Sequence, residues 1–435
     1  MSTNRIKDVL LRLLTAVFAS KPLGMSQESL GRSSVEYEGS LASHVGPDDM
    51  LSILATSMPA FITTLGDSER VNAAVASIST NVVAPLFRSR AFPNNVNRNI
   101  LSLLEQTAKI PAAVKIWKKD VADAFNDGRF FGSHVDQVKG GWMDIFRQWT
   151  LVDKDKLPEL MSRVPPPSTA GIMFGVGAGA ARLDADRKAQ LNLRRMGLLI
   201  VSASEDYFAG SLSGLLQKLE DLITATNTSS PSSATRAEIF MVLRALILKT
   251  TPGAIAPFWP LISAELQEAI SSISIQQQQQ RHHHHHHQDV YNPYSLLQAC
   301  KLLDLLLVLA PDEFQLLEWL FVTDSVDALY PPSNNQRWGS IALADEISRN
   351  LSSPFPIEEK TSDDDSSGTK RRPWLISKRI ETIPKEEIID RILGPFLGRL
   401  SIRTFESTYN MGIPDWDCCL DNLLVDLFDE STMVS

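Results

Sequence analysis

The sequence predicts an all-α protein, an irregular α-solenoid of HEAT-like helix pairs with two disordered insertions. Apolar residues recur at three- and four-residue spacing through most of the chain, which is the period of amphipathic helices. The signal of β-hairpins, alternating Val, Ile and Thr runs closed by Asn-Gly or Asp-Gly, hardly occurs. Proline and glycine divide the helical runs into short pieces, which must stack to bury their apolar faces. No strict repeat period is found, so the stack should be irregular.

The composition limits the possible classes of protein. The chain has 435 residues, 43% of them hydrophobic, enough for two or three domains or for one extended stack of helices. Its formal net charge of −9 argues against a nucleic-acid partner, because nucleic-acid binders are usually basic. The three cysteines form no CxxC motif, and their odd number does not suggest a set of disulfide pairs. They are Cys300, Cys418 and Cys419. Such usage is typical of a reducing compartment, so we expect a cytosolic protein.

An N-terminal helical part is expected over residues 1–164. It begins with MSTNRIKDVLLRLLTAVFASKP, where Arg12 interrupts the apolar run and the spacing is helical, which favours an amphipathic helix over a signal peptide. No window reaches the roughly 18 uninterrupted apolar residues that a membrane span requires. Further helices are expected over 48–65, 68–87, 97–109, 112–126 and 133–149.

Central helical repeats are expected over 182–275 and 289–350. A long helix is predicted at 184–204, and Asp206 is placed to cap the helix that follows it. The three prolines of TPGAIAPFWPLISAELQEAI (251–270) indicate a tight corner before a further helix.

Two capping boxes mark predicted helix starts in these repeats. Thr235 and Glu238 have the required spacing ahead of IFMVLRALILKT. Ser295 and Gln298 have the same spacing at the start of a leucine-rich stretch. A helix should therefore begin at each place.

Two low-complexity segments should interrupt the helices. QQQQQRHHHHHHQ (276–288) cannot bury apolar surface, so we expect a mobile Gln/His insertion. Its histidines lack a fixed ligand geometry, and no functional metal site is predicted there. Residues 352–373, which contain DDDSSG and KRRP, should form a disordered linker.

The most apolar stretch is SLLQACKLLDLLLVLAPDEFQLLEWLFVTD (295–324). Apolar residues occupy nearly every side of its first helix, which indicates a buried helix that ends at Pro311. Its apolar core is too short to cross a bilayer. A leucine zipper stays an alternative, although Pro311 would interrupt its heptads. The heptad positions would be Leu302, Leu309 and Leu316.

C-terminal helices are expected over 374–435, at 384–400 and 415–430. The basic segment KRRPWLISKR, just before them, suggests a lipid-binding site, because cations attract anionic headgroups and tryptophan favours the membrane interface. The alternative is a solvated linker that balances the preceding aspartates. The residues of this predicted site are Lys370, Arg371, Arg372, Trp374, Lys378 and Arg379.

The last helix, DWDCCLDNLLVDLFDE, is acidic and amphipathic. Its broad apolar face could dock on a partner as a helix in a groove. The alternative is that the helix closes the end of its own helical stack. The residues of this face are Trp416, Leu420, Leu423, Leu424 and Leu427.

Four segments carry a resemblance to known proteins: AVKIWKKDVADAFNDGRFF (113–131), LNLRRMGLLIVSASEDYF (191–208), FMVLRALILKTTPGAIAPFWPLISAELQEAI (240–270) and LLQACKLLDLLLVLAPDEFQLLEWLFV (296–322). In this order they resemble the C-terminal region of the Dopey family of trafficking proteins. The first is similar to the family's Trp-Lys-Lys helix ending in Phe-Phe, and the second to its Leu-Lys-Arg helix followed by Ser-Glu-x-Asp. The third is similar to its leucine-rich helix followed by a Leu-Trp-Pro corner.

The resemblance implies a non-catalytic scaffold in Golgi–endosome vesicle and protein transport. It implies a cytosolic protein, peripheral on trans-Golgi and endosomal membranes, whose partners are an Arf-exchange-factor-like Golgi scaffold protein and an aminophospholipid flippase. A phosphoinositide-reading adaptor that links organelles to a microtubule motor is the alternative, because the family is reported to bind such lipid through its C-terminal region. Family members are several times longer, so we expect a C-terminal fragment or a truncated gene model.

Catalytic motifs are not found in the sequence. There is no HExxH and no P-loop, and the isolated His44 and His134 suggest no Ser-His-Asp or Cys-His set. The glycine run GVGAGA (175–180) lacks the GxGxxG spacing and a preceding strand. We therefore predict no enzyme activity, no cofactor and no metal.

Overall fold

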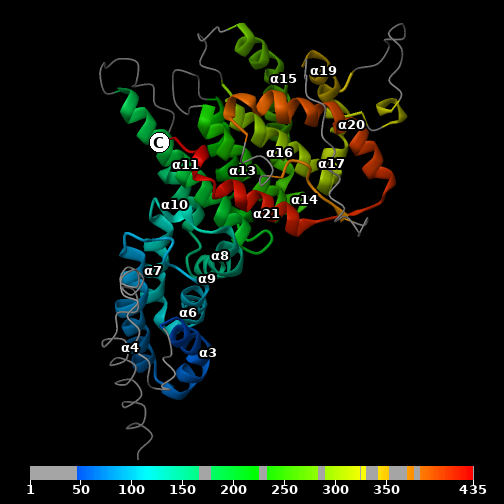
Figure 1. Ribbon diagram of the computed structural model, residues 1–435. Helices are drawn as coiled ribbons and strands as arrows, with labels where there is room; N and C mark the ends of the chain where they lie inside the picture. Colours follow the sequence, from blue (N-terminus) through cyan, green and yellow to red (C-terminus); the bar gives the residue numbers. More distant parts are fainter. Residues whose placement is uncertain are drawn as a thin grey trace, which may run out of the picture. The chain divides into compact units, whose positions relative to one another are not determined.

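The computed structural model describes residues 47–165, 178–224, 233–282, 290–323, 325–329, 341–351, 370–376 and 383–434 (Figure 1). Helices make up nearly all the regular structure of these residues, which confirms the predicted all-α class. The chain divides into two compact units, residues 1–156 and 157–435. The amphipathic helix predicted at the N-terminus and the first half of the glycine run, residues 175–177, lie outside the described residues.

The first unit consists of short antiparallel helices, and three of the predicted ranges correspond to composite helices with a 3₁₀ or π turn. The turns are η1 (Ser79–Val83), η2 (Pro111–Ala113), η3 (Phe130–Gly132) and η4 (Val138–Trp142). The α-helices are α3 (Pro47–Leu65), α4 (Ser68–Ile78), α5 (Ala84–Arg88), α6 (Arg98–Ala108), α7 (Val114–Asn126), α8 (Val135–Gln137) and α9 (Met143–Val152). Side-chain caps begin two of them: Asp67 accepts from the Glu69 amide, and Asn97 accepts from the Ile100 amide.

Aromatic side chains fill the core of the first unit. Phe125 packs edge-on against Phe146 and Trp149, and the centroid of each of those rings lies 5.1 Å from its own. Close packing of the helices also requires one glycine. A Cβ atom on Gly141 would lie 2.7 Å from Leu101 Cδ1, so only glycine lets η4 approach α6 this closely.

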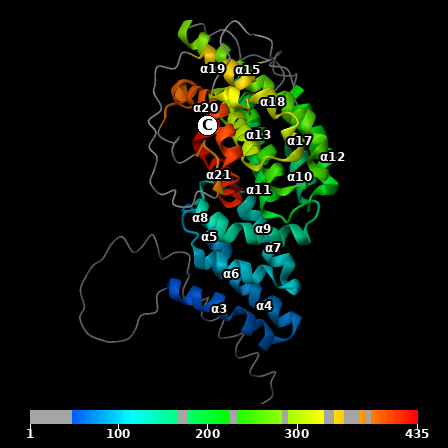
Figure 2. The ribbon, with the colours of Figure 1, turned by 90° about the vertical axis from the view of Figure 1, so that its right-hand side faces the viewer.

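The second unit carries the longest helices (Figure 2). Its α-helices are α10 (Lys156–Arg163, which contains the boundary), α11 (Ala178–Ser202), α12 (Leu212–Thr224), α13 (Ser233–Lys249), α14 (Pro252–Ile255), α15 (Trp259–His282), α16 (Pro293–Leu309), α17 (Asp312–Gln315), α18 (Glu318–Phe321), α19 (Leu343–Asn350), α20 (Gly394–Tyr409) and α21 (Trp416–Leu427). Its 3₁₀ or π turns are η6 (Ala209–Ser211), η7 (Ala256–Phe258), η8 (Val326–Ala328), η10 (Lys385–Glu387), η11 (Ile389–Leu393) and η12 (Glu430–Thr432). Two-residue strands, β1 (Lys370–Arg371) and β2 (Ile413–Pro414), pair in parallel.

Helix α13 packs against α11 and α16, and α21 packs against α11 and α13. Leucine side chains of α16 are buried on nearly every side, so the predicted buried helix is confirmed. The zipper alternative does not hold, because Leu302 is buried inside the unit whereas Leu316 is 75% exposed. Helix α16 ends at Leu309, its C-cap Ala310 is left-handed with a φ of 48°, and Pro311 is the N-cap residue of α17.

Three local predictions about helix starts are corrected. Asn292 caps α16 and forms a capping box with Ser295, so this helix starts before the position that the sequence spacing suggested. Glu238 lies buried inside α13 and pairs with Arg194 instead of capping. Asp206 has a left-handed backbone and accepts hydrogen bonds from the amide and hydroxyl of Thr251, which joins two corners of the unit.

The limits of the two predicted insertions also change. Helix α15 extends into the Gln/His tract as far as His282, and the buried amide of Gln277 donates to Asp390. The expectation of a mobile segment from 276 is therefore wrong for residues 276–282, because the apolar face of α15 holds the helix in place and Gln277 gains a polar partner. Residues 370–373 of the predicted linker are also ordered, and residues 283–289 and 352–369 lie outside the described residues.

The helix predicted at 384–400 changes type at Gly394 and Pro395. The π turn η11 ends at Leu393, and α20 continues from Gly394 to Tyr409, with Pro395 in its first turn. The Gly394 amide donates to the Ile389 carbonyl within the π turn, and Pro395 takes the first-turn position at which helices accept proline. The resulting helix extends well beyond the predicted end at residue 400.

Candidate functional site

The predicted lipid-binding residues are only partly within the described chain. Lys370, Arg371, Arg372 and Trp374 belong to an ordered segment, residues 370–376, which we call the basic segment. Lys378 and Arg379 lie outside the described residues. The basic segment lies between α16, α20 and α21, where it lines a cavity.

Backbone and side-chain hydrogen bonds hold the basic segment in place. The Asp415 amide donates to the Arg371 carbonyl over 2.9 Å, next to the β1–β2 pair. The guanidinium Nε of Arg372 donates to Asp415 Oδ2 over 2.9 Å. This ion pair holds the pKa of the Asp415 carboxyl below its ordinary value. The amide of Asn422 on α21 donates to the Leu375 carbonyl.

Asp304 of α16 provides the central anchor. Its Oδ2 accepts the backbone N–H of Trp374 over 2.7 Å and that of Leu375 over 2.8 Å. Burial raises the pKa of this carboxyl to about 6, although the two backbone hydrogen bonds and the charge of Arg403 oppose the shift. A carboxylate inside a leucine-rich helix thus holds the C-terminal part of the basic segment.

Trp374 packs inside the unit. Its ring lies against Phe396, with 5.7 Å between ring centroids, and the Arg403 guanidinium lies 4.8 Å from its centroid. Arg403 thus lies over the half-buried ring, which also packs on α20, and a role of this indole in a membrane interface stays a prediction.

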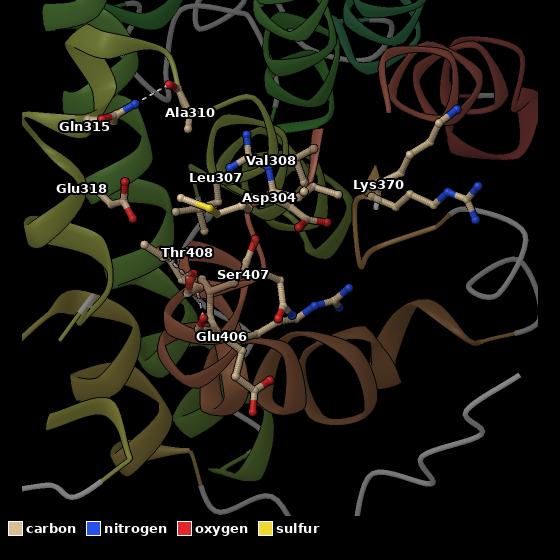
Figure 3. A pocket seen from close by; sticks show the side chains of 18 residues that line it. Asp304, Leu307, Val308, Ala310, Gln315, Glu318, Lys370, Glu406, Ser407 and Thr408 are labelled. Carbon is tan, nitrogen blue, oxygen red and sulfur yellow. Dashed lines mark hydrogen bonds between the residues drawn. The ribbon is translucent and has the colours of Figure 1, made fainter. Parts of the chain in front are cut away.

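The cavity beside the basic segment has a volume of about 710 Å³ (Figure 3). Its wall combines α16, α17, α18, β1, α20 and the turn before β2. Cationic and acidic side chains both line it. They are Lys370, Arg371, Arg372 and Arg403, with Asp304, Glu318 and Glu406.

Two of the cations form no salt bridge among the described residues, although the charge of Lys370 helps to lower the pKa of the nearby Asp415 carboxyl. Lys370 is exposed, and the Nε of Arg371 is buried without a hydrogen-bond acceptor. A buried hydrogen-bond donor that has no acceptor destabilises the fold by about 1–3 kcal/mol. The other two cations are engaged, Arg372 by Asp415 and Arg403 by the Trp374 ring. Lys370 and Arg371 are thus the cations best placed to meet a ligand.

The predicted docking face of α21 lies mostly in the core. Leu423, Leu424 and Leu427 are fully buried, so the docking prediction is corrected for these leucines. Leu420 is half-buried, and Trp416 is 51% exposed. The helix packs on α11 and α13 because its leucines continue their shared apolar core. This is the alternative in which α21 closes its own helical stack.

Buried ion pairs join α21 to the centre of the unit. Asp426 accepts from Arg244 over 2.5 Å and from Lys301 over 2.7 Å, and all three side chains are buried. On α11, the Arg194 guanidinium donates to Glu238 and to the carbonyls of Leu427 and Asp429. These ion pairs have a structural role, because a buried charge without its partner would destabilise the fold.

No catalytic constellation is evident among the described residues. No group of His, Cys, Asp and Glu within that part of the chain is arranged to hold a metal ion. Burial raises the pKa of the Cys300 thiol, and it raises that of Cys419 to about 12, which disfavours the nucleophilic thiolate. In the same ranges, no helix combines the length and apolarity needed to cross a membrane.

The site residues that were not predicted carry only a partial signal in the sequence. Lys301 and Asp304 stand out as charges in an apolar helix, but nothing local identifies their partners. Arg403, Glu318 and Glu406 lie on ordinary amphipathic helices and look like solvated surface. The strand Ile413–Pro414 is too short for a periodic signal.

Comparison with known proteins identifies the family. The family model described as DOP1 C-terminal matches residues 3–410. The chain is 60% identical to Protein dop1 of Emericella nidulans over 98% of this chain and 23% of that protein. It is 24% identical to Protein DOP1 of Saccharomyces cerevisiae over 82% of this chain and 20% of that protein. For Protein DOP1B of Xenopus laevis, the identity is 24% over 68% of this chain and 14% of that protein.

The chain spans less than a quarter of the length of each of these relatives. No solved structure matches it. The family-model match covers most of the chain, and the four resembling segments all lie within it. The chain therefore belongs to the DOP1 (Dopey) family and corresponds to its C-terminal region.

Proposed function

We propose that the chain is part of a non-catalytic scaffold of the Dopey type, acting in vesicle and protein transport between Golgi and endosomes. The observation that carries the proposal is the family match over residues 3–410. The buried ionisable groups pair with one another between helices, which is consistent with a scaffold. The protein would work in the cytosol, peripheral on trans-Golgi and endosomal membranes.

The proposed partners are an Arf-exchange-factor-like Golgi scaffold protein and an aminophospholipid flippase. Exposed apolar side chains on the second unit supply surface for such contacts. Leu316, Trp319, Tyr409, Met411 and Ile413 are each more than half exposed. Large apolar side chains in water favour association, because binding removes their surface from solvent.

The test compares the tagged chain with the tagged full-length protein in affinity purification, with bound proteins identified by mass spectrometry. We expect both partners with the full-length protein, and at least one of them with this chain. Substituting Trp319 and Met411 by Ser should reduce that recovery, whereas Leu151→Ser, at an exposed position of the first unit, should not. Failure to recover either partner with the full-length protein would refute the proposal.

A second candidate function is a phosphoinositide-reading adaptor that links organelles to a microtubule motor. It is favoured by the exposed Lys370 and by Arg371, which lacks a carboxylate partner. Each basic residue near an anionic surface contributes about 1 kcal/mol. Flotation with phosphoinositide-containing vesicles should therefore weaken by about thirtyfold or more in the double variant K370E/R371E, which removes two basic residues and adds two acidic ones. The control is K115E, on the exposed side of α7, and unchanged flotation of the double variant would exclude this role for the basic segment.

A further inference from the structure

Helix α3, at the edge of the first unit, has an outer side without charge (Figure 2). Leu51, Ala55 and Met58 are buried, and the helix packs on α6. Its opposite side faces solvent within the described chain, yet residues 50–65 include no charged side chain. Surface helices carry charged or polar side chains on their solvent side, and the end of a helical stack needs a polar outer face to stay soluble.

This outer side can be buried without losing hydrogen bonds. Thr56, Ser57, Thr63 and Thr64 each donate to a main-chain carbonyl four residues earlier in the same helix. Contact with an apolar partner would therefore leave none of these hydroxyls without an acceptor. Ile53 lies among them and is 61% exposed, so the outer side also offers apolar area.

Two larger apolar side chains lie beside this outer side. Leu54 and Phe61 are only half-buried, although both are apolar and belong to the same helix. Ala60, which is exposed, lies two helical turns from Ile53 on one side of α3, and its small side chain lets a second helix approach closely. A further helix laid along the outer side would complete the burial of these residues.

A segment with a complementary pattern precedes α3 in the chain. Ile6, Leu10, Leu13 and Val17 follow three- and four-residue spacing, so a helix over residues 6–18 would have an apolar stripe. The family model matches from residue 3, so this segment is part of the DOP1 C-terminal region.

The other side of the same segment is polar. Asp8, Arg12 and Thr15 fall opposite the apolar stripe in the helical period. Once the stripe was buried, these side chains would stay in water. They would supply the charged outer surface that α3 itself lacks.

The connection between the two is long enough. Residues 19–46 separate the segment from α3, and an unstructured chain of that length spans roughly 30 Å. Helix α3, with 19 residues, is about 28 Å long, so the segment can reach all of its outer side. A tethered partner has an effective concentration in the millimolar range, which favours it over a second copy of the chain.

We propose that residues 6–18 form an amphipathic helix that packs on the outer side of α3 and closes this edge of the first unit. Its apolar stripe covers Ile53 and Ala60, and it completes the burial of Leu54 and Phe61. The edge of the unit then carries charge instead of an uncharged face. This proposal is independent of the scaffold function.

Hydrogen exchange of the full chain, read by mass spectrometry over peptides of α3, tests the packing. In the double variant L10D/L13D, exchange of the α3 amides should accelerate at least about tenfold, because aspartate cannot enter an apolar interface and α3 loses its cover. The matched control is T15D, on the polar side of the segment, which should leave exchange unchanged. Peptides of α7 report whether the core of the unit stays folded.

The variant I53D tests the same contact from the side of α3. A substitution at an exposed position normally changes stability little, but here it should lower the melting temperature of the first unit by about 4 °C or more. K115D, at an exposed position of α7, is the control. In the L10D/L13D background, I53D should have little further effect, because the two changes disrupt one interface.

Cysteine pairs decide the case in which L10D/L13D unfolds the whole unit. In the full chain with Cys418→Ser, I53C is combined in turn with L10C, L13C and V17C. Mild oxidation should join at least one of these pairs within a single chain, whereas the pair I53C/T15C should remain reduced.

Four results would overturn the proposal. They are the absence of a disulfide in all three pairs, equal oxidation of the I53C/T15C pair, disulfides that form only between chains, and unchanged α3 exchange in L10D/L13D. Disulfides between chains would assign the outer side of α3 to a second copy. Unchanged exchange together with vesicle flotation that I53D abolishes would assign it to a membrane surface.

Discussion

At the scale of single residues, Asp304 determines where the basic segment lies. Its carboxylate accepts two backbone N–H groups from that segment, inside a helix otherwise rich in leucine. Without this acceptor, both amides would be buried without a partner. The buried charge has an energetic cost of its own, because removal from water disfavours the ionised form.

Asp304 should make stability depend on pH. Burial raises its pKa to about 6 from 3.8, so the folded state holds a proton that the unfolded chain has released. The stabilising contribution of the protonated form is therefore complete below pH 3.8 and is lost as pH rises through 6. Linkage gives about 1.4 kcal/mol more unfolding free energy from this group at pH 5 than at pH 7.5.

The variant D304N tests this contribution, because asparagine keeps an acceptor for the segment but does not titrate. Urea denaturation at the two pH values should show a stability difference smaller by about 1 kcal/mol than in the parent chain. Glu238 and Glu265, whose pKa values are also raised by burial, contribute in the same direction in both proteins. An unchanged pH dependence in D304N would contradict the assignment.

Single residues show where prediction from sequence ends. Lys301 and Asp304 are visible as charges in an apolar run, but Lys301 pairs with Asp426, 125 residues later. Only the fold brings such positions together, so periodicity alone could not assign the pair. For the same reason the sequence could not show that Arg403 and Phe396 pack against the half-buried ring of Trp374.

At the scale of elements, α21 is joined to the unit by both packing and charge. Leu427 approaches α11 at Gly197, where a Cβ atom would lie 3.4 Å from Leu427 Cδ2. Asp426 meets Arg244 of α13 and Lys301 of α16. One carboxylate thus balances two buried cations and connects three helices.

Asp426→Ala should destabilise the unit strongly, by about 3–5 kcal/mol, because both cations would remain buried without a counter-charge. Denaturation by urea measures the loss. The matched control is the triple variant R244M/K301M/D426L, in which apolar side chains replace all three charges. It should lose much less stability than D426A, since buried ion pairs and well-packed apolar groups are often nearly equivalent. Equal losses in the two variants would indicate that packing of α21, not charge, is decisive.

Element types were predictable from periodicity, whereas element ends were not. The helices at 48–65 and 97–109 correspond closely to α3 and α6, because amphipathic spacing is a local property. Ends depend on caps and partners. Helix α16 starts at an asparagine that lies outside the expected box, and α15 continues into the Gln/His tract because Gln277 finds a buried partner.

At the scale of the whole molecule, the family-model match ends at an earlier residue than the folded structure does. The match ends at residue 410, but ordered structure continues to Val434. Arg187 donates to the Val434 carbonyl, and Gln190 accepts from the Val434 amide. The residues beyond the match thus belong to the core of the second unit.

Truncation after Asn410 should therefore prevent the second unit from folding cooperatively. It would remove β2 and α21, uncover the leucine core of α11 and α13, and leave Arg244 and Lys301 without Asp426. Removing one partner of a buried pair alone costs about 3–5 kcal/mol, comparable to the roughly 5–15 kcal/mol by which domains are stable. Circular dichroism should show loss of the cooperative thermal transition of this unit. A chain that lacks only Ser435 is the control, and a transition at the parental temperature after truncation at Asn410 would show that α21 is dispensable for the fold.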